Sequence, residues 1–85
     1  MTQTDIKRGV YAVLIEMGIP QKAITDNASF QRDLGLDSLD FAEMVLQFEM
    51  RFDVDMPITE AEDITTVKEA IDYLTAILRM KAVAN

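Results

Sequence analysis

Residues 33–52 read DLGLDSLDFAEMVLQFEMRF, and they contain the clearest helical pattern in the chain. Gly35 favours a turn, and Asp37 or Ser38 suits the start of a helix, where a short polar side chain accepts a hydrogen bond from a free backbone N–H group. After Ser38, apolar residues recur at the spacing i, i+4, i+7 and i+11, which places them on one helix face. The pattern therefore predicts a helix over residues 38–52. Its core-facing residues are Phe41, Val45, Phe48 and Phe52.

The same helix carries a second apolar face, formed by Leu39, Leu46 and Met50 with Glu43 between them. A helix that is apolar on more than one side is either deeply buried or covered by a partner. Burial is the commoner case, but a domain of 85 residues has few surfaces that could cover a second face. The sequence leaves both interpretations open.

Upstream, helical spacing predicts a first helix from about Thr4 to Met17, with Thr4 or Asp5 as its cap. Gly18 and Pro20 end it, because glycine favours the left-handed turn that follows a helix and proline cannot continue one. The apolar stripe of this helix is Ile6, Val10, Val13, Leu14 and Met17.

Downstream, Pro57 stops the central helix from continuing, and Thr59–Asp63 suits a short helix of one or two turns. The last helix is predicted from about Thr66 to Met80, because Thr66 and Glu69 have the spacing of a capping box. No region alternates at period two, so no strand is predicted. The core stripe of the last helix is Val67, Ala70, Ile71, Leu74, Ile77 and Leu78.

The chain is thus predicted to be all-α, with three main helices and one short helix. A long loop, residues 19–37, joins the first two helices, and a loop of this length is usually functional or pinned by apolar anchors. We expect a single domain over residues 1–85, with a core of about residues 4–80 and a frayed tail over residues 81–85. The expected anchors of the loop are Ile24, Phe30, Leu34 and Leu36.

Composition narrows the possible functions. The chain has no cysteine and no histidine, which removes disulfides, thiolate chemistry and the commonest general base and metal ligand. Its formal net charge of −7 disfavours nucleic acids and anionic membrane surfaces as partners, because like charges repel. No stretch resembles a signal peptide or a transmembrane span, so we expect a cytoplasmic protein without membrane insertion.

Several kinds of site are excluded by the residues present. The three glycines are scattered and form no phosphate-binding loop, and neither zinc sites nor serine–histidine catalysis is possible. Two acidic segments, Asp33–Met44 and Asp53–Ile64, lack the sixth-position glycine and the final glutamate of a calcium-binding loop. We therefore predict no catalytic residue and no metal ligand.

Ser38 remains, where a loop meets a helix start between Asp37 and Asp40. Serine is a common helix cap, and acidic residues near a helix start complement its dipole, so plain capping explains these residues. Alternatively, a phosphate is esterified to this hydroxyl, because the free N–H groups of a helix start suit a phosphodiester. The residues alone favour capping.

The segment Asp-Leu-Gly-Leu-Asp-Ser-Leu-Asp, residues 33–40, resembles the phosphopantetheine attachment motif of acyl carrier proteins. Three further segments, Phe48–Pro57, Glu62–Val67 and Ala70–Leu74, resemble the end of the second helix and the third and fourth helices of that family. The similarity is in register over roughly residues 30–74 and weaker in the first helix. It identifies Ser38 as the expected attachment site.

The resemblance implies a four-helix bundle and a 4′-phosphopantetheine arm, transferred from coenzyme A to Ser38 beside Asp37. Acyl groups would be attached to the thiol of the arm as thioesters, for synthesis of the fatty acid or polyketide type. The chain itself would not catalyse any step of this synthesis. The implied partners are a phosphopantetheinyl transferase and basic-surfaced synthase and acyltransferase enzymes, and the chain is expected to be a monomer. By position, the partner-binding residues would be Asp37, Leu39, Asp40, Glu43 and Leu46.

The family can also hold the acyl chain between its helices. Phe41 stands where the family commonly has a smaller residue, and we hypothesise that it narrows the pocket or favours particular chains. Met50 and Arg51 stand where the family often has two acids, which indicates a specialised set of partners. By position, the pocket would be lined by Phe30, Phe41, Met44, Val45, Phe48, Met56, Ala61, Ile64 and Ala70.

Two rival functions stay open at this stage. One is a carrier of aminoacyl or peptidyl groups on the same arm, although that family more often has a different sequence around the serine and less acid. The other is an acidic helical interaction module without a prosthetic group, in which Ser38 is only a cap. The presence or absence of the arm distinguishes carriers from the module.

Overall fold

The computed structural model describes the backbone of residues 1–84 and the side chains of residues 1–82. The elements, in order, are α1 (Gln3–Glu16), a 3₁₀ turn η1 (Gln21–Ala23), α2 (Ser38–Phe52), α3 (Ile58–Ala61) and α4 (Val67–Ala84). Within residues 1–84 there is no strand, only one isolated antiparallel bridge between Ser29 and Thr66. The prediction of an all-α fold with three main helices and one short helix is confirmed.

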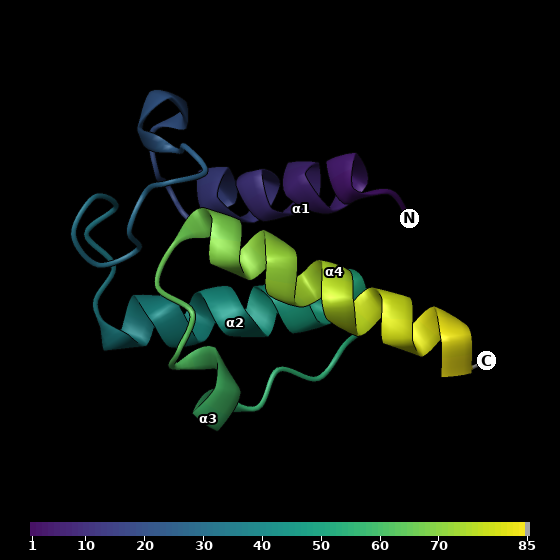
Figure 1. The fold of residues 1–85 in the computed structure, drawn as a ribbon. Coiled ribbons are helices and arrows are strands. Elements are labelled where there is room, and N and C mark those ends of the chain that lie inside the picture. The colour runs from purple at the N-terminus through teal and green to yellow at the C-terminus, as the bar shows by residue number, and fades with distance from the viewer. Residues whose placement is uncertain (85) are drawn as a thin grey trace.

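The three long helices pack together, with α1 in contact with both α2 and α4. Figure 1 shows α1 above α2, α4 crossing in front of α2, and the short α3 below α2. The connection from α1 to α2 lies at one end of the molecule, and the labelled N and C ends lie at the other (Figure 1). The start of α2 is therefore far from both ends of the chain.

Helix bounds agree with the sequence for α2, which covers residues 38–52 as predicted. The prediction for the start of α1 was wrong, because Thr2 is the cap and forms a capping box with Asp5. Two threonines near a helix start can each serve as a cap, and the sequence does not distinguish between them.

The short helix also differs from its prediction, since α3 covers Ile58–Ala61 instead of Thr59–Asp63. Pro57 takes the cap position. A proline is tolerated at a helix start, because the N–H group that it lacks would have no hydrogen-bond acceptor within the helix. After α3 the chain tightens into three-residue turns, in which Asp63 N donates to Glu60 O at 3.2 Å and Ile64 N donates to Ala61 O at 3.0 Å.

The last helix runs to Ala84, four residues beyond the predicted end at Met80. The fraying of the tail from residue 81 stays a prediction. Lys81 Nζ lies 3.1 Å from Asp53 Oδ2, and this ion pair ties the last turns of α4 to the end of α2. Residue 85 lies outside the described residues. The predicted capping box at the start of α4 is confirmed, because Glu69 N donates to Thr66 Oγ1 and Thr66 N donates to Glu69 Oε1.

The core forms where the apolar stripes of the long helices meet. Phe48 is fully buried at its centre, and Val45 and Phe52 are buried beside it, while Phe41 at the start of the stripe is half-buried. Gly9 lets α1 approach α2 closely, because a Cβ there would come within 2.5 Å of Phe52 Cζ. The stripes therefore bury one face of each helix and leave the start of α2 at the edge of the core.

The long connection between α1 and α2 is held in place by buried apolar side chains and by backbone hydrogen bonds. Ile24, Phe30 and Leu36 are buried as predicted, and Leu34 is half-buried. Backbone hydrogen bonds also join the connection to the start of α4: Lys68 N donates to Asp26 O, Val67 N to Ala28 O, and Phe30 N to Thr65 O. This connection is consequently a fixed support for the helix start that follows it.

Asp26 supplies a side-chain anchor for the same connection. Its carboxylate accepts a hydrogen bond from Tyr11 Oη at 2.7 Å and lies 3.2 Å from Lys7 Nζ. The Tyr11 hydrogen bond, followed by the nearby lysine, lowers the pKa of Asp26. Burial and the Asp26 carboxylate raise the pKa of Tyr11 to about 12, so at neutral pH the phenol keeps its proton and donates it.

We expect Asp26→Asn to destabilise the fold at neutral pH and much less in acid. The carboxylate is favoured in the folded state, so its contribution to the free energy of unfolding is present above the usual aspartate pKa and is lost as the pH falls through the lowered folded pKa. Urea unfolding at several values between about pH 7 and about pH 3 measures this difference. Asp55→Asn, at an exposed site without a described side-chain hydrogen bond, is the control. A difference between wild type and Asp26→Asn that does not change with pH would contradict the assignment.

Candidate functional site

Ser38 is the first residue of α2 and is exposed. The cap is the preceding residue, Asp37, whose Oδ1 accepts from Asp40 N at 2.8 Å, while Asp40 Oδ2 accepts from Asp37 N at 3.3 Å. Because of this reciprocal capping box, the Ser38 hydroxyl is not needed to cap the helix. None of the hydrogen bonds among the described residues involves it. The interpretation of Ser38 as a simple cap is therefore wrong, and its hydroxyl is free for chemistry.

The backbone immediately before Ser38 is fixed by hydrogen bonds and by a buried side chain. Gly35 has φ +69°, a left-handed conformation that glycine adopts without the penalty of a Cβ. Leu36 is buried, and its N–H donates to Phe30 O at 2.9 Å, which fixes the chain one residue before the cap. Asp33 Oδ2 accepts from Ser29 N at 2.7 Å and closes the preceding turn. An exposed serine thus sits on a rigid helix start.

The start of α2 still offers hydrogen-bond donors. Within the described part of the chain, the N–H groups of Ser38 and Leu39 make no hydrogen bond, whereas Asp40 N and Phe41 N are satisfied by Asp37. Free N–H groups at a helix start attract an anion such as a phosphate. Asp37 and Asp40 add negative charge nearby, so this end of the helix does not hold a free anion strongly.

A cavity of about 520 Å³ opens beside Ser38. Of the predicted pocket residues, Phe30, Phe41 and Ile64 line it, and the others lie elsewhere. Met44, Val45, Phe48, Met56, Ala61 and Ala70 are buried in the core and do not line it. The residues that do line it are Ser29, Phe30, Gln31, Leu36, Asp37, Ser38, Phe41, Ala42, Ile58, Glu62, Ile64 and Thr65.

Ile58 is a lining residue that the sequence analysis missed. It is 52% exposed at the first position of α3 and lines the same cavity as Phe41 and Ser38. A large apolar residue directly after Pro57, at the start of a short helix, was the available signal. Its position makes α3 one wall of the cavity.

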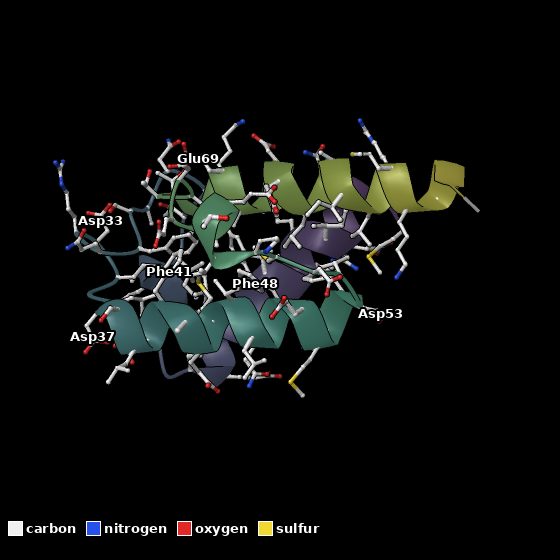
Figure 2. The ribbon with its side chains drawn as sticks, turned by 90° about the horizontal axis from the view of Figure 1, so that it is seen from below. Asp33, Asp37, Phe41, Phe48, Asp53 and Glu69 are labelled. Carbon is white, nitrogen blue, oxygen red and sulfur yellow. The ribbon has the colours of Figure 1, made fainter. Side chains whose placement is uncertain are left out.

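The outer face of α2 is exposed, which decides between the two interpretations of its second apolar stripe. Leu39 and Met50 are 80% and 70% exposed and Leu46 is half-exposed, so burial within this chain is excluded for the described residues. Asp40 and Glu43 are exposed between them, and Glu43 Oε1 accepts from Gln47 Nε2 at 3.0 Å. Figure 2 shows Asp37 and Asp53 at the two ends of this helix, with Phe41 and Phe48 on its inward side.

The described residues contain neither a cluster of metal-ligating side chains nor a helix that could span a membrane. Across residues 1–84, no three histidine, cysteine or acidic side chains come close enough together to hold a metal ion. In the same residues, no helix is both long enough and apolar enough to span a bilayer.

Comparisons with known proteins point to one kind of site. The family model for the phosphopantetheine attachment site matches residues 12–74. The acyl carrier protein of Chlorobium phaeobacteroides is 43% identical over 75 residues, which cover 87% of this chain and 96% of that protein. Both similarities include α2 and the exposed serine at its start.

Proposed function

The chain belongs to the acyl carrier protein family, whose members hold a phosphopantetheine attachment site, and from this premise we propose that Ser38 carries the arm on which acyl intermediates travel as thioesters. The cofactor is 4′-phosphopantetheine, attached covalently. The exposed Ser38 hydroxyl, relieved of capping by Asp37, is the observation that carries the proposal.

The residues around Ser38 fit the arm. A phosphodiester on this hydroxyl would lie beside the free N–H groups of Ser38 and Leu39, which suit its charge. The cavity next to Ser38 offers Phe41, Ile58 and other apolar side chains to the far end of the arm. When bound, the arm supplies a terminal thiol, which the sequence itself lacks.

Attachment requires one displacement at phosphorus. Ser38 Oγ attacks the coenzyme A phosphorus that bears the pantetheine, a P–O bond to this oxygen forms, and 3′,5′-ADP leaves. We assign the base that takes up the hydroxyl proton to the transferase. The chain then presents intermediates and does not itself catalyse their conversion.

We propose that the partners are a phosphopantetheinyl transferase and basic-surfaced synthase and acyltransferase enzymes of fatty acid or polyketide type synthesis. We also propose that the carrier acts in the cytoplasm and as a monomer. Within residues 33–63 there are ten of the 15 acidic residues and only one basic residue, Arg51. A surface of one sign attracts partners of the other sign. The acids are Asp33, Asp37, Asp40, Glu43, Glu49, Asp53, Asp55, Glu60, Glu62 and Asp63.

The outer face of α2 is the proposed docking surface, formed by Asp37, Leu39, Asp40, Glu43 and Leu46. All five side chains are exposed around the start and middle of α2. Apolar residues flanked by acids can bury against a partner while the charges set its orientation.

Charge reversal of Glu43 to lysine is expected to slow association with the transferase by about tenfold at low ionic strength. Because salt screens the attraction, the difference from wild type should shrink as ionic strength rises. Stopped-flow measurement of the association rate constant tests this. Asp55→Lys changes the net charge equally at an exposed site beyond α2, and it should have a smaller effect. Equal slowing by both variants would contradict a localised docking surface.

The kind of cargo is tested on the chain once it carries its arm. An ATP-dependent ligase for fatty acids and one for amino acids are offered in parallel, and intact mass is measured before and after treatment with neutral hydroxylamine, which cleaves thioesters. We expect fatty acyl loading that hydroxylamine reverses. Loading by the amino acid ligase alone would instead support a carrier of aminoacyl groups.

A further inference from the structure

Two aromatic rings stand between the cavity beside Ser38 and the core. The ring centroids of Phe30 and Phe41 lie 6.0 Å apart at an interplanar angle of 65°, an edge-to-face pair. Both residues line the cavity, Phe30 being 2% exposed and Phe41 half-buried. Edge-to-face contact is a favoured geometry for aromatic rings, so the two side chains hold each other in place.

The order of residues along α2 places Phe41 between Ser38 and the deeper core. Phe41 follows Ser38 by one helical turn and precedes Met44 and Val45 by one turn on the same inward side. Figure 2 shows Phe41 nearer the Asp37 end of α2 and Phe48 farther along, both on the inward side. A chain running from Ser38 into the core would have to pass Phe41.

The other ring has a fixed backbone. Phe30 N donates to Thr65 O, and Phe30 O accepts from Leu36 N, both at 2.9 Å. Phe30 is therefore held between the start of α4 and the segment that leads to Ser38. Because the Phe30 side chain is 2% exposed and the Phe41 side chain is half-buried, the Phe41 ring has more space in which to change its rotamer.

Beyond the pair, the interior is filled. Met44 is 1% exposed, Phe48 and Ala61 are 0% exposed, and none of the three lines the cavity. On the near side, Phe41, Ile58 and Ile64 form an apolar floor that is open to the surface. An apolar chain next to Ser38 therefore meets a surface groove before it meets the core.

Resting on the proposed function, we propose that Phe41 is a specificity-determining residue: with Phe30 it closes the path from Ser38 to the core, so that the acyl chain lies in the surface groove against Phe41, Ile58 and Ile64. Because this groove is open to the surface, a longer acyl chain that lies in it gains little further protection from water. Removing the Phe41 ring opens the path toward Met44.

The test uses the chain with its arm, loaded with butyryl, octanoyl and dodecanoyl groups. Neutral hydroxylamine reports how exposed each thioester is, and methyl NMR signals report where the chain lies, with Ile58 and Ile64 for the groove and Met44 for the core. For wild type we expect cleavage rates within about twofold for octanoyl and dodecanoyl, because no additional methylenes are buried. The Ile58 and Ile64 signals shift on loading, and the Met44 signal does not.

For Phe41→Ala we expect cleavage to slow by about fourfold for each further methylene that enters the core, together with a shift of the Met44 signal. Phe41→Leu, a milder change, should give the same trend and serves if the alanine variant does not fold. Met50→Ala, on the exposed face of the same helix and outside the proposed docking residues, is the matched control and should behave as wild type.

The proposed role of Phe41 would be contradicted if, in wild type, the dodecanoyl thioester were markedly better protected than the octanoyl thioester and the Met44 signal shifted. The proposed carrier function would not be affected by that result. Variants at Phe41 that match wild type in both readouts would also contradict the proposed role of Phe41. A chain that never takes up the arm would overturn the proposed function, and this failure is visible by mass before any acyl chain is loaded.

Discussion

Replacing Ser38 by alanine is expected to abolish attachment of the phosphopantetheine arm while leaving the fold intact. The hydroxyl oxygen is the atom that forms the phosphodiester, so its removal eliminates the reaction instead of weakening it. Asp37 supplies the helix cap, and within residues 1–84 no hydrogen bond depends on the Ser38 side chain. The free energy of unfolding should therefore change by no more than about 0.5 kcal/mol.

Ser29→Ala is the matched control, because Ser29 is the other of the two serines in the chain and also lines the cavity. Its hydroxyl accepts from Arg32 N at 3.1 Å, so this variant loses a hydrogen bond but keeps Ser38. Both variants are treated with coenzyme A and a phosphopantetheinyl transferase, and intact mass is recorded. Continued labelling of Ser38→Ala would show that another residue carries the arm.

Replacing Phe48 by alanine is expected to lower the free energy of unfolding by about 3–5 kcal/mol, the range for a fully buried phenylalanine whose site cannot collapse. Phe48 is 0% exposed at the centre of the α2 stripe, and its ring centroid lies 6.4 Å from that of Phe52. The free energy of unfolding of a single domain is typically about 5–15 kcal/mol, and it is often lower in domains as small as this one. The variant should therefore be partly unfolded at physiological temperature.

Urea unfolding followed by circular dichroism measures this loss. Met50→Ala is the comparison, because Met50 is 70% exposed on the outer face of the same helix, and its effect should stay within about 0.5 kcal/mol. A loss below about 1 kcal/mol for Phe48→Ala would mean that the core is not centred on this ring.

Local patterns were enough to predict α2. Its bounds follow from a polar cap before the first turn and from an apolar stripe that ends at Phe52, and both signals lie within the helix itself. The same kind of signal predicted the capping box of Thr66 and Glu69. These features depend on residues three or four positions apart, which a sequence displays directly.

Features that depend on distant contacts could not be predicted. The extension of α4 to Ala84 coincides with the ion pair between Lys81 and Asp53, and the close approach of α1 to α2 needs Gly9 opposite Phe52. Neither pairing has a signal within its own segment, because the partners are more than 25 positions apart in the chain.

The site was predicted in part for the same reason. Ser38 and the exposed acidic face of α2 follow from neighbouring residues and from the family resemblance. The lining of the cavity beside Ser38 depends on how α3 and the connection are folded against α2, which no local pattern displays. Phe30, Phe41 and Ile64 line this cavity, whereas Met44 is buried in the core.

The most direct test of the account is a peptide map of the unmutated chain after exposure to coenzyme A and a phosphopantetheinyl transferase. The account predicts a single added mass of about 340 Da, the size of the arm, on the one peptide that contains Ser38. An unchanged mass, or an arm found on any other residue, would contradict it.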